Sequence, residues 1–249
     1  MIPFPYVLRR RMMVSGGGGN NFPAVGTPLA DWTWEQIIAL ANSGENPQNY
    51  FAVGDEKNLV LTTGEVVPVL IGDFYHNAIT GTTTQAAFAF SFKNCLNTKY
   101  TMNGTNSGGW PASQMRNSIV PSILNTFPAE LTANNAIKYV DVISGVGNGE
   151  NRVTTSSDRL RMLSVTELGT SNTNAVKGEG TKYAYYTSGT RRRKKIGTSN
   201  AQYYTRTPFG ISGNSNNFGS LSMVAISTSG GTESIYASTS SGVSFAFDI

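Results

Sequence analysis

The sequence predicts an α+β fold in which antiparallel strands predominate and are joined by short helices and long polar loops. Charged residues make up only 14% of the 249 residues, against about 25% in typical globular domains, and glycine and small polar residues replace them. Short apolar runs bounded by turn residues recur along the chain, and some alternate with polar residues as strands do. A chain of this length can bury enough surface to fold without disulfides.

The single cysteine and the single histidine limit the chemistry available to the chain. Cys95 cannot form an internal disulfide, and cysteine-rich zinc sites need more ligands than this chain offers. A serine or cysteine triad could use only His76 as its base. We therefore expect no catalytic residues, no metal site and no cofactor. Two short basic clusters carry much of the net charge of +4, so nucleic acid is not an expected partner.

The first 30 residues predict an extended N-terminal arm. Prolines interrupt its start, and Gly16 to Gly19 form a flexible joint. We expect residues 1–30 to be a docking arm with a glycine hinge and residues 31–249 to be one folded domain. The arm could bind an acidic, partly apolar groove of another protein, and plain disorder is the alternative. The docking candidates are Tyr6, Arg9, Arg10, Arg11, Met12 and Met13.

The order of residues in this arm also bears on location. Apolar residues precede the basic ones, which is the reverse of a secretory signal. No apolar run approaches the length of about 18 residues that a membrane-spanning helix needs. These features predict synthesis in the cytoplasm and no insertion into a membrane.

Helix and strand signals alternate from residue 31 to about residue 163. Thr33 and Gln36 form a capping signal, and apolar residues at helical spacing follow it over 34–41. Residues 58–62 and 66–71 flank a Thr-Gly turn as the strands of a hairpin. Residues 88–92 alternate phenylalanine with smaller side chains, which predicts a half-buried strand. Further expected elements are short helices within 108–125 and from 128, and strands at 139–143 and 160–163.

The last quarter of the chain is rich in Gly, Ser, Thr, Asn and Tyr, a composition that by itself suggests a linker. Interleaved apolar residues predict short strands separated by long polar loops instead. In the final segment, apolar residues recur at a period of two up to Ile249. The expected strands are 203–204, 221–226, 235–236 and 243–249, and the last of them ties the end of the chain into a sheet.

Three chemically suggestive segments have simpler interpretations. Gly178 to Lys182 is similar to a phosphate loop only superficially, because no strand and helix flank it, and it predicts a turn. His76 follows Asp73 and could act as a general base, but such a histidine is more often a polar loop residue. The cluster Arg191-Arg-Arg-Lys-Lys195 is typical of a solvated loop tip, although it could bind an anionic polymer or an acidic neighbouring subunit.

The composition of the C-terminal loops favours a recognition surface. Tyr, Ser, Gly and Asn predominate in paratopes, because tyrosine gives contact area at low entropic cost and the small polar residues give adaptable hydrogen bonds. Tight turns and solvated edges would need the same residues, so that alternative stays open. The candidate ligand-binding residues are Tyr203, Tyr204, Asn214, Asn216, Asn217 and Tyr236.

A series of short blocks is spread over residues 31–249. The blocks are Trp34-Glu-Gln-Ile37 with Ala41-Asn-Ser-Gly44, Phe51-Ala-Val-Gly-Asp-Glu-Lys57, Leu61-Thr-Thr-Gly-Glu65, Gly108-Gly-Trp110 with Ser113-Gln-Met-Arg116, Thr155-Ser-Ser-Asp158 with Leu163-Ser164, Thr205-Arg-Thr-Pro208 and Gly242-Val-Ser-Phe-Ala-Phe-Asp-Ile249. Their order and spacing resemble a domain-of-unknown-function family that is common in phages, prophages and gut Firmicutes. The resemblance implies a C-type-lectin-like fold, shared by formylglycine-generating enzymes and by variable receptor-binding proteins of phages. The cysteine pair of the catalytic members and the calcium motifs of animal lectins do not occur here.

The resemblance implies a phage virion protein without enzymatic activity. We expect the arm to dock onto other virion proteins and the C-type-lectin-like domain to bind a glycan or protein of the bacterial surface, as in a tail fibre. A homo-oligomer is expected, with a trimer suggested by virion fibres in general. The alternatives are a capsid decoration or collar protein that cements its neighbours, and an enzyme that acts on the cell envelope.

Overall fold

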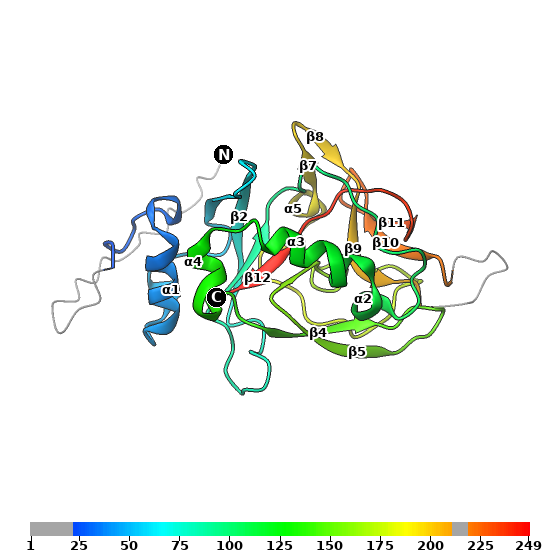
Figure 1. The fold of residues 1–249 in the computed structure, drawn as a ribbon, viewed down its shortest axis with the longest axis horizontal. Helices are drawn as coiled ribbons and strands as arrows, with labels where there is room; N and C mark the ends of the chain where they lie inside the picture. The colour runs from blue at the N-terminus through cyan, green and yellow to red at the C-terminus, as the bar shows by residue number, and fades with distance from the viewer. Residues whose placement is uncertain (1–21, 211–218) are drawn as a thin grey trace, which may run out of the picture.

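The computed structural model describes residues 22–210 and 219–249, and Figure 1 shows their arrangement. Within these residues the fold is mixed α and β, with antiparallel strands in small sheets and a few short helices. This confirms the expected class. The strands form a five-stranded sheet, a three-stranded sheet and two separate hairpins among the described residues.

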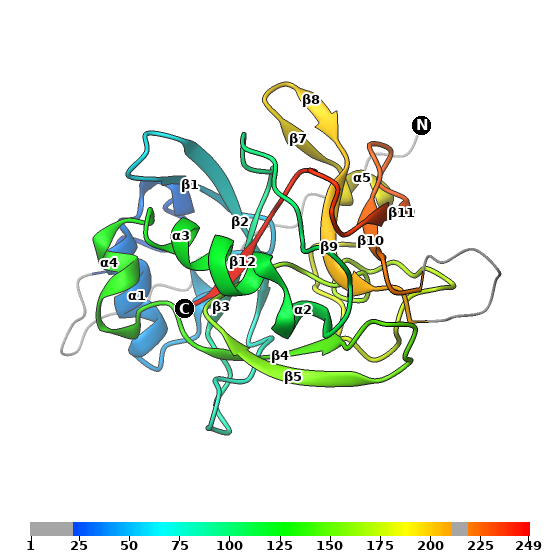
Figure 2. The same cartoon turned by 45° about the vertical axis from the view of Figure 1, so that its right-hand side comes forward.

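The five-stranded sheet is the centre of the molecule, and its strand order is β1-β2-β3-β12-β6. Neighbouring strands are antiparallel throughout. The last strand of the chain, β12, is the red arrow in Figures 1 and 2, and in the sheet it pairs with β3 on one side and β6 on the other. The expected end of the chain in a sheet is therefore confirmed. The strands are β1 (Glu56–Val60), β2 (Val66–Phe74), β3 (Phe88–Phe92), β12 (Ala246–Asp248) and β6 (Leu160–Arg161).

The β1–β2 hairpin has the predicted turn. Leu61 donates its main-chain N–H to the carbonyl of Glu65, and Gly64 takes a φ of 86°, which glycine adopts without strain. Strand β3 was expected to be half-buried, and this was wrong, because every residue of the strand is buried. Its phenylalanines face the main core, while the other face is covered by Tyr183 and Tyr186.

Helix α1 (Trp34–Asn42) begins with the predicted capping box. Thr33 accepts a hydrogen bond from the N–H of Gln36 at 3.2 Å, and the Gln36 side chain accepts one from the N–H of Thr33 at 2.9 Å. The apolar face of α1 is buried, and Figure 1 places α1 beside α4. The described part of the expected arm packs on the domain too, since the Phe22 ring stacks on Trp32.

The remaining helices are short and lie mainly between residues 109 and 135. Pro121 lies in the first turn of α3, directly after the π-helical turn η3. The short helices are η1 (Leu29–Asp31), η2 (Pro47–Asn49), α2 (Gly109–Ala112), the π-helical turn η3 (Met115–Ile119), α3 (Val120–Leu124), α4 (Ala129–Thr132), η4 (Ala133–Asn135) and α5 (Gly189–Arg192).

The polar last quarter contributes regular structure to a second sheet. Strands β11 (Thr232–Tyr236), β10 (Ser222–Ile226) and β9 (Tyr203–Pro208) form a three-stranded antiparallel sheet in that order. The expected strands at 203–204, 221–226 and 235–236 are confirmed, and of the expected strand 243–249 only β12, Ala246–Asp248, is regular. The two hairpins consist of β4 (Val140–Gly145) with β5 (Val153–Asp158) and of β7 (Lys194–Ile196) with β8 (Ser199–Ala201).

The basic cluster at 191–195 is the expected solvated segment only in part, because Arg191, Arg193 and Lys195 are exposed whereas Arg192 is half-buried and Lys194 is buried. Its residues form the end of α5 and the start of β7. Arg192 and Arg193 each donate a hydrogen bond of 2.9 Å to a main-chain carbonyl of the β10–β11 turn. Lys194 is buried, and its ammonium group donates to the carbonyl of Phe92. These three cations hold loops together, Lys194 from inside the protein and Arg193 at the surface.

Candidate functional site

A buried carboxylate, Asp158, joins the helical region to the β4–β5 hairpin. Its Oδ2 accepts hydrogen bonds from the indole of Trp110 at 2.9 Å and from the hydroxyl of Ser156 at 2.7 Å. Arg116 donates from Nε to Oδ1 at 2.6 Å. Because both carboxylate oxygens are occupied by donors, the charge of Asp158 is neutralised inside the protein. We call these contacts the Asp158 hub.

A second hub surrounds Arg206 on β9, which is completely buried. Its guanidinium makes a bidentate ion pair with Glu167, with an Nη2–Oε1 distance of 2.7 Å. It also donates to the carbonyl oxygens of Ile143 and Met162, at 2.9 and 2.8 Å. One side chain therefore fixes the separation of β4, β6 and the turn at 164–169. The geometry uses the fork of donors that only arginine offers.

Glu179 lies against the same hub and is also completely buried. Its Oε1 accepts the N–H of Gly145 at 2.7 Å, while no hydrogen-bond partner reaches its Oε2 among the described residues. Burial raises the pKa of Glu179 to about 7, although the nearby Arg206 guanidinium opposes the rise.

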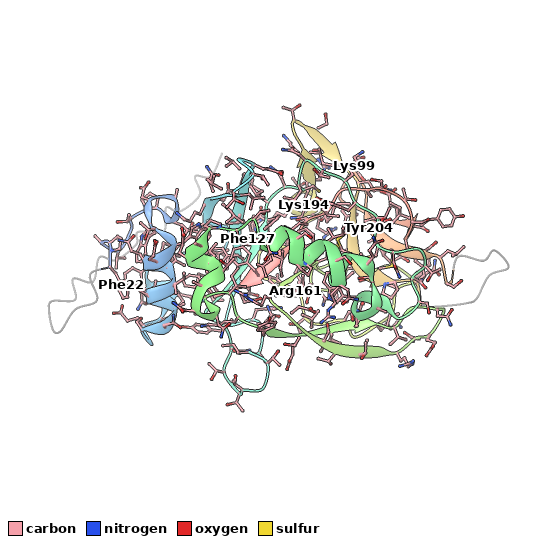
Figure 3. All side chains as sticks on the ribbon, viewed as in Figure 1. Phe22, Lys99, Phe127, Arg161, Lys194 and Tyr204 are labelled. Atoms are coloured by element: carbon pink, nitrogen blue, oxygen red, sulfur yellow. The ribbon has the colours of Figure 1, made fainter. Side chains whose placement is uncertain are left out.

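A third hub links the end of the chain to the loops on the opposite face of the sheet. Arg161 pairs with Asp248, and its Nη2 donates to the hydroxyl of Tyr183 at 2.6 Å. The Asn77 amide donates to both Asp248 and Tyr183 at 2.8 Å. Burial alone would lower the pKa of Arg161, but the adjacent Asp248 carboxylate raises it overall. In Figure 3, Arg161 lies in the middle of the molecule.

The Asp73–His76 pair extends this third hub. The imidazole lies on the Tyr183 ring with 4.0 Å between centroids, and Nδ1 is 2.9 Å from Oδ2 of Asp73. Nε2 lies 3.2 Å from the carbonyl oxygen of Thr181. Burial disfavours the charge on Asp73, but hydrogen bonds from His76 and from two main-chain N–H groups outweigh it and lower the pKa of Asp73. His76 therefore joins the end of β2 to the 178–182 turn.

At one end of the molecule, several loops meet around the buried Asn106. Its side chain donates to the carbonyls of Gly219 and Ser222 at 2.8 and 2.6 Å, and its Oδ1 accepts the N–H of Asn148 at 2.9 Å. We call loops 104–108, 146–152, 172–178 and 219–221 the loop end. Figure 2 shows the tip of β4–β5 and the start of β10 close together at this end, on the right of the view.

Glycine is required where two of these loops meet. Gly147 has a φ of +70°, and a Cβ on it would lie 1.9 Å from the carbonyl oxygen of Asn106. The loop at 172–178 joins the same end, because Ala175 pairs with Phe209 and the N–H of Gly210 donates to the carbonyl of Asn174 at 2.8 Å. Residues 210 and 219, which border the segment 211–218, are thus both anchored at the loop end.

Two of the six candidate ligand-binding residues are interior, which corrects our expectation. Tyr203 and Tyr204 are only 2% and 1% exposed, and their hydroxyls donate to main-chain carbonyls. Packed elements cover both faces of β9, so neither ring can stack on a ligand at the surface. Tyr236 is 48% exposed on β11. The candidates outside the described residues are Asn214, Asn216 and Asn217, and the arm residues Tyr6, Arg9, Arg10, Arg11, Met12 and Met13.

The charged residues that form the hubs were not predicted from the sequence. The pattern that could have indicated them is a charged residue inside an apolar strand. Arg161 stands between Leu160 and Met162, and Asp248 stands between Phe247 and Ile249. A charge in such a position must be paired, since charged residues are seldom fully buried alone. The sequence does not show which two charges pair.

A groove of about 490 Å³ contains none of the loop-end residues in its lining. It lies between the β1–β2 turn, the chain at 96–100 and α3. Leu61, Leu96 and Ile123 form its apolar part, and Glu65 at its rim accepts the N–H of Asn97 at 2.8 Å. Its polar groups therefore mostly serve the fold.

The residues that the structure describes contain neither a cluster of potential metal ligands nor a membrane-spanning helix. Within 22–210 and 219–249, no three histidine, cysteine, aspartate or glutamate residues gather as potential metal ligands. No helix in these ranges has the length and apolar character to cross a bilayer.

The fold and its three buried hubs define a β-rich domain. Several residues of the sequence blocks make hydrogen bonds within these hubs, namely Trp110, Arg116, Asp158, Ser164 and Arg206. A family model described as "Domain of unknown function (DUF6273)" matches residues 83–249, more than half of the chain. The chain belongs to this family. Comparison with curated proteins and with solved structures gives no match.

Proposed function

We propose that this chain is a phage virion protein whose domain has a C-type-lectin-like fold and binds a glycan or protein of the bacterial surface without catalysing a reaction. The arm attaches the chain to other virion proteins, and the loop end carries the binding surface. The support comes from the sequence resemblance, from the described polar loops of the last quarter and from the buried frame behind them.

The observation that carries this proposal is that charged residues of the sequence blocks lie inside the protein and hold its strands and loops together. Asp158 and Arg206 each have several partners inside the protein, so they position strands and loops and face no open cleft. A rigid frame lowers the entropy that a loop surface loses on binding. Buried charged residues that fix the positions of the loops therefore suit a binding module. The exposed loop residues are not needed to hold the loops in place and can differ without loss of the frame.

Exposed side chains beside the loop end could make the contact. Leu221 and Tyr236 are 37% and 48% exposed; Leu221 directly precedes β10, Tyr236 ends β11, and the next residue, Ala237, donates its N–H to the carbonyl of Leu221 at 2.8 Å. An aromatic face next to polar loops suits a sugar ring or a protein surface. Many copies on one particle, in a trimer or another homo-oligomer, would multiply a weak single-site affinity.

The test compares two tyrosines of equal exposure. Tyr236→Ala removes an exposed ring beside the loop end, and Tyr139→Ala removes one that is 50% exposed at the start of β4. Labelled purified chain is incubated with intact cells of the bacterium that the encoding phage infects, and the cell-bound fraction is measured. We expect Tyr236→Ala to reduce binding about tenfold, the effect of about 1.4 kcal/mol, and Tyr139→Ala to leave it unchanged.

Other outcomes of this test would point to the alternatives. If neither variant alters binding, while deletion of residues 1–20 prevents incorporation into particles, the chain is a capsid decoration or collar protein that cements its neighbours. Release of soluble fragments from purified cell walls would instead show an envelope-acting enzyme. Either result would overturn the proposed binding function.

A further inference from the structure

The surroundings of Glu179 contain an unbalanced set of charges. Both carboxylate oxygens of Glu167 are bound by Arg206, so the guanidinium is already fully matched. Arg206 reaches Glu179 only at its main-chain carbonyl, at 3.4 Å. The Glu179 carboxyl group is thus a second acid beside one arginine, and the groups that donate to it, the N–H of Gly145 and the hydroxyl of Thr207, are both uncharged.

Other ionisable groups do not supply the missing charge. Arg161 lies beyond Arg206 and is paired with Asp248. His76 contacts Thr181, two residues along the chain, and faces Asp73. The remaining neighbour on β9 is Thr207, whose hydroxyl hydrogen bond lowers the pKa of Glu179 but supplies no charge, and burial outweighs it. A completely buried carboxyl group in these surroundings favours its neutral, protonated form.

Glu179 also lies where a small change could move a loop. Glycines with φ of +86° and +87° stand on both sides of it, at 178 and 180, and such glycines act readily as hinges. The preceding residues are part of the loop end, since Val176 is buried and Asn174 accepts the N–H of Gly210. The Gly145 contact is the side-chain bond that holds Glu179 to β4.

We propose that Glu179 is a proton-controlled latch, which in its protonated form keeps segment 172–180 closed against β4 and β9 and on losing its proton releases that segment from the loop end. Any effect of the latch on binding rests on the proposed function, whereas its effect on the segment does not.

The direction of the pH effect follows from the pKa values. Closure raises the pKa of Glu179 from 4.5 to about 7, so the closed form binds more protons than the open form between these values. The contribution to closure is therefore complete below about pH 4.5, falls as the pH rises towards 7 and stays low above it. If opening restores the ordinary pKa, the population of the open segment should rise about thirtyfold between about pH 5.5 and pH 8.5.

The experiment measures amide hydrogen exchange of segment 172–180 in the full chain at these two pH values, as protection factors corrected for intrinsic exchange rates. The wild-type factors should fall about thirtyfold on going to high pH. Glu179→Gln, which keeps a neutral side chain of the same shape, should remove this dependence. Glu150→Gln, an exposed change in the β4–β5 turn, should preserve it.

A second measurement does not depend on a variant folding correctly. The carboxyl carbon resonance of Glu179 in the wild-type chain should titrate near pH 7. Titration near pH 4.5, or protection factors that do not change with pH, would overturn the proposal. If the latch behaves as expected while Tyr236→Ala does not affect cell binding, the proposed binding function fails and the latch stands.

Discussion

Replacement of Arg206 by methionine should destabilise the protein severely. The change removes the donors to Glu167, Ile143 and Met162 and leaves the Glu167 carboxylate buried without its partner. Breaking a buried ion pair on one side costs about 3–5 kcal/mol, a large part of the total of about 5–15 kcal/mol that stabilises a typical domain. The free energy of unfolding, measured in urea at neutral pH, should fall by this amount.

A double-mutant cycle separates the ion pair from loss of packing. Glu167→Met alone should also destabilise the protein, and the double variant should lose less than the two single changes together, with a coupling of about 1–3 kcal/mol. The control is Arg152→Met, which breaks the exposed pair with Glu150 and should cost no more than about 1 kcal/mol. If Arg206→Met costs as little as Arg152→Met, the buried frame does not hold the loops as we argue.

Two further changes test single contacts by equilibrium unfolding. Gly147→Ala places a Cβ 1.9 Å from a main-chain oxygen and should lower the free energy of unfolding by about 2 kcal/mol or more. The control Gly64→Ala, at a glycine with positive φ but open space around it, should lower it by about 1 kcal/mol. Equal losses would mean that the loops can move apart freely. Trp110→Phe removes the indole that donates to Asp158. The control is Trp32→Phe, because the buried indole N–H of Trp32 has no partner among the described residues. Trp110→Phe should lower the free energy of unfolding by about 1–2 kcal/mol more than the control, and no difference would argue against the Asp158 hub.

The local features of the fold could be predicted because local chemistry determines them. The Thr33–Gln36 capping box depends on residues three apart, and the β1–β2 turn depends on Gly64. The alternation that ends at Ile249 placed the last strand in a sheet. In each of these cases the residues that make the structure are neighbours in the sequence, so the pattern carries enough information.

The errors have a common physical cause, which is coverage by distant parts of the chain. Tyr203 and Tyr204 have the composition of a binding surface, but packed elements bury β9 on both faces. Residues 191–195 have the composition of a solvated tip, and Arg191, Arg193 and Lys195 are exposed, but the turn at 227–231 also offers carbonyls to Arg192 and Arg193, and Lys194 is buried. A local pattern shows that a side chain is polar, and it does not show whether a distant segment will supply its partner.

The candidate site was predictable only in outline. The Tyr-, Gly- and Asn-rich composition indicated the polar loops near Tyr236, but Asn106, at the centre of the loop end, gave no such signal. Its role depends on loops up to 116 residues away in the chain. A buried asparagine with all its hydrogen bonds satisfied looks like any surface asparagine in the sequence.

Trypsin digestion of the native chain tests most directly whether the buried frame holds the loop end rigid. Arg152 and Lys177 are exposed cleavage sites in the loops at 146–152 and 172–178, and a protease needs a segment that can unfold locally. At about pH 6, where the proposed Glu179 latch is closed, both sites should survive in the wild-type chain under conditions that cleave them rapidly in Arg206→Met. Cleavage of the wild-type chain at either site as fast as in urea would contradict the account.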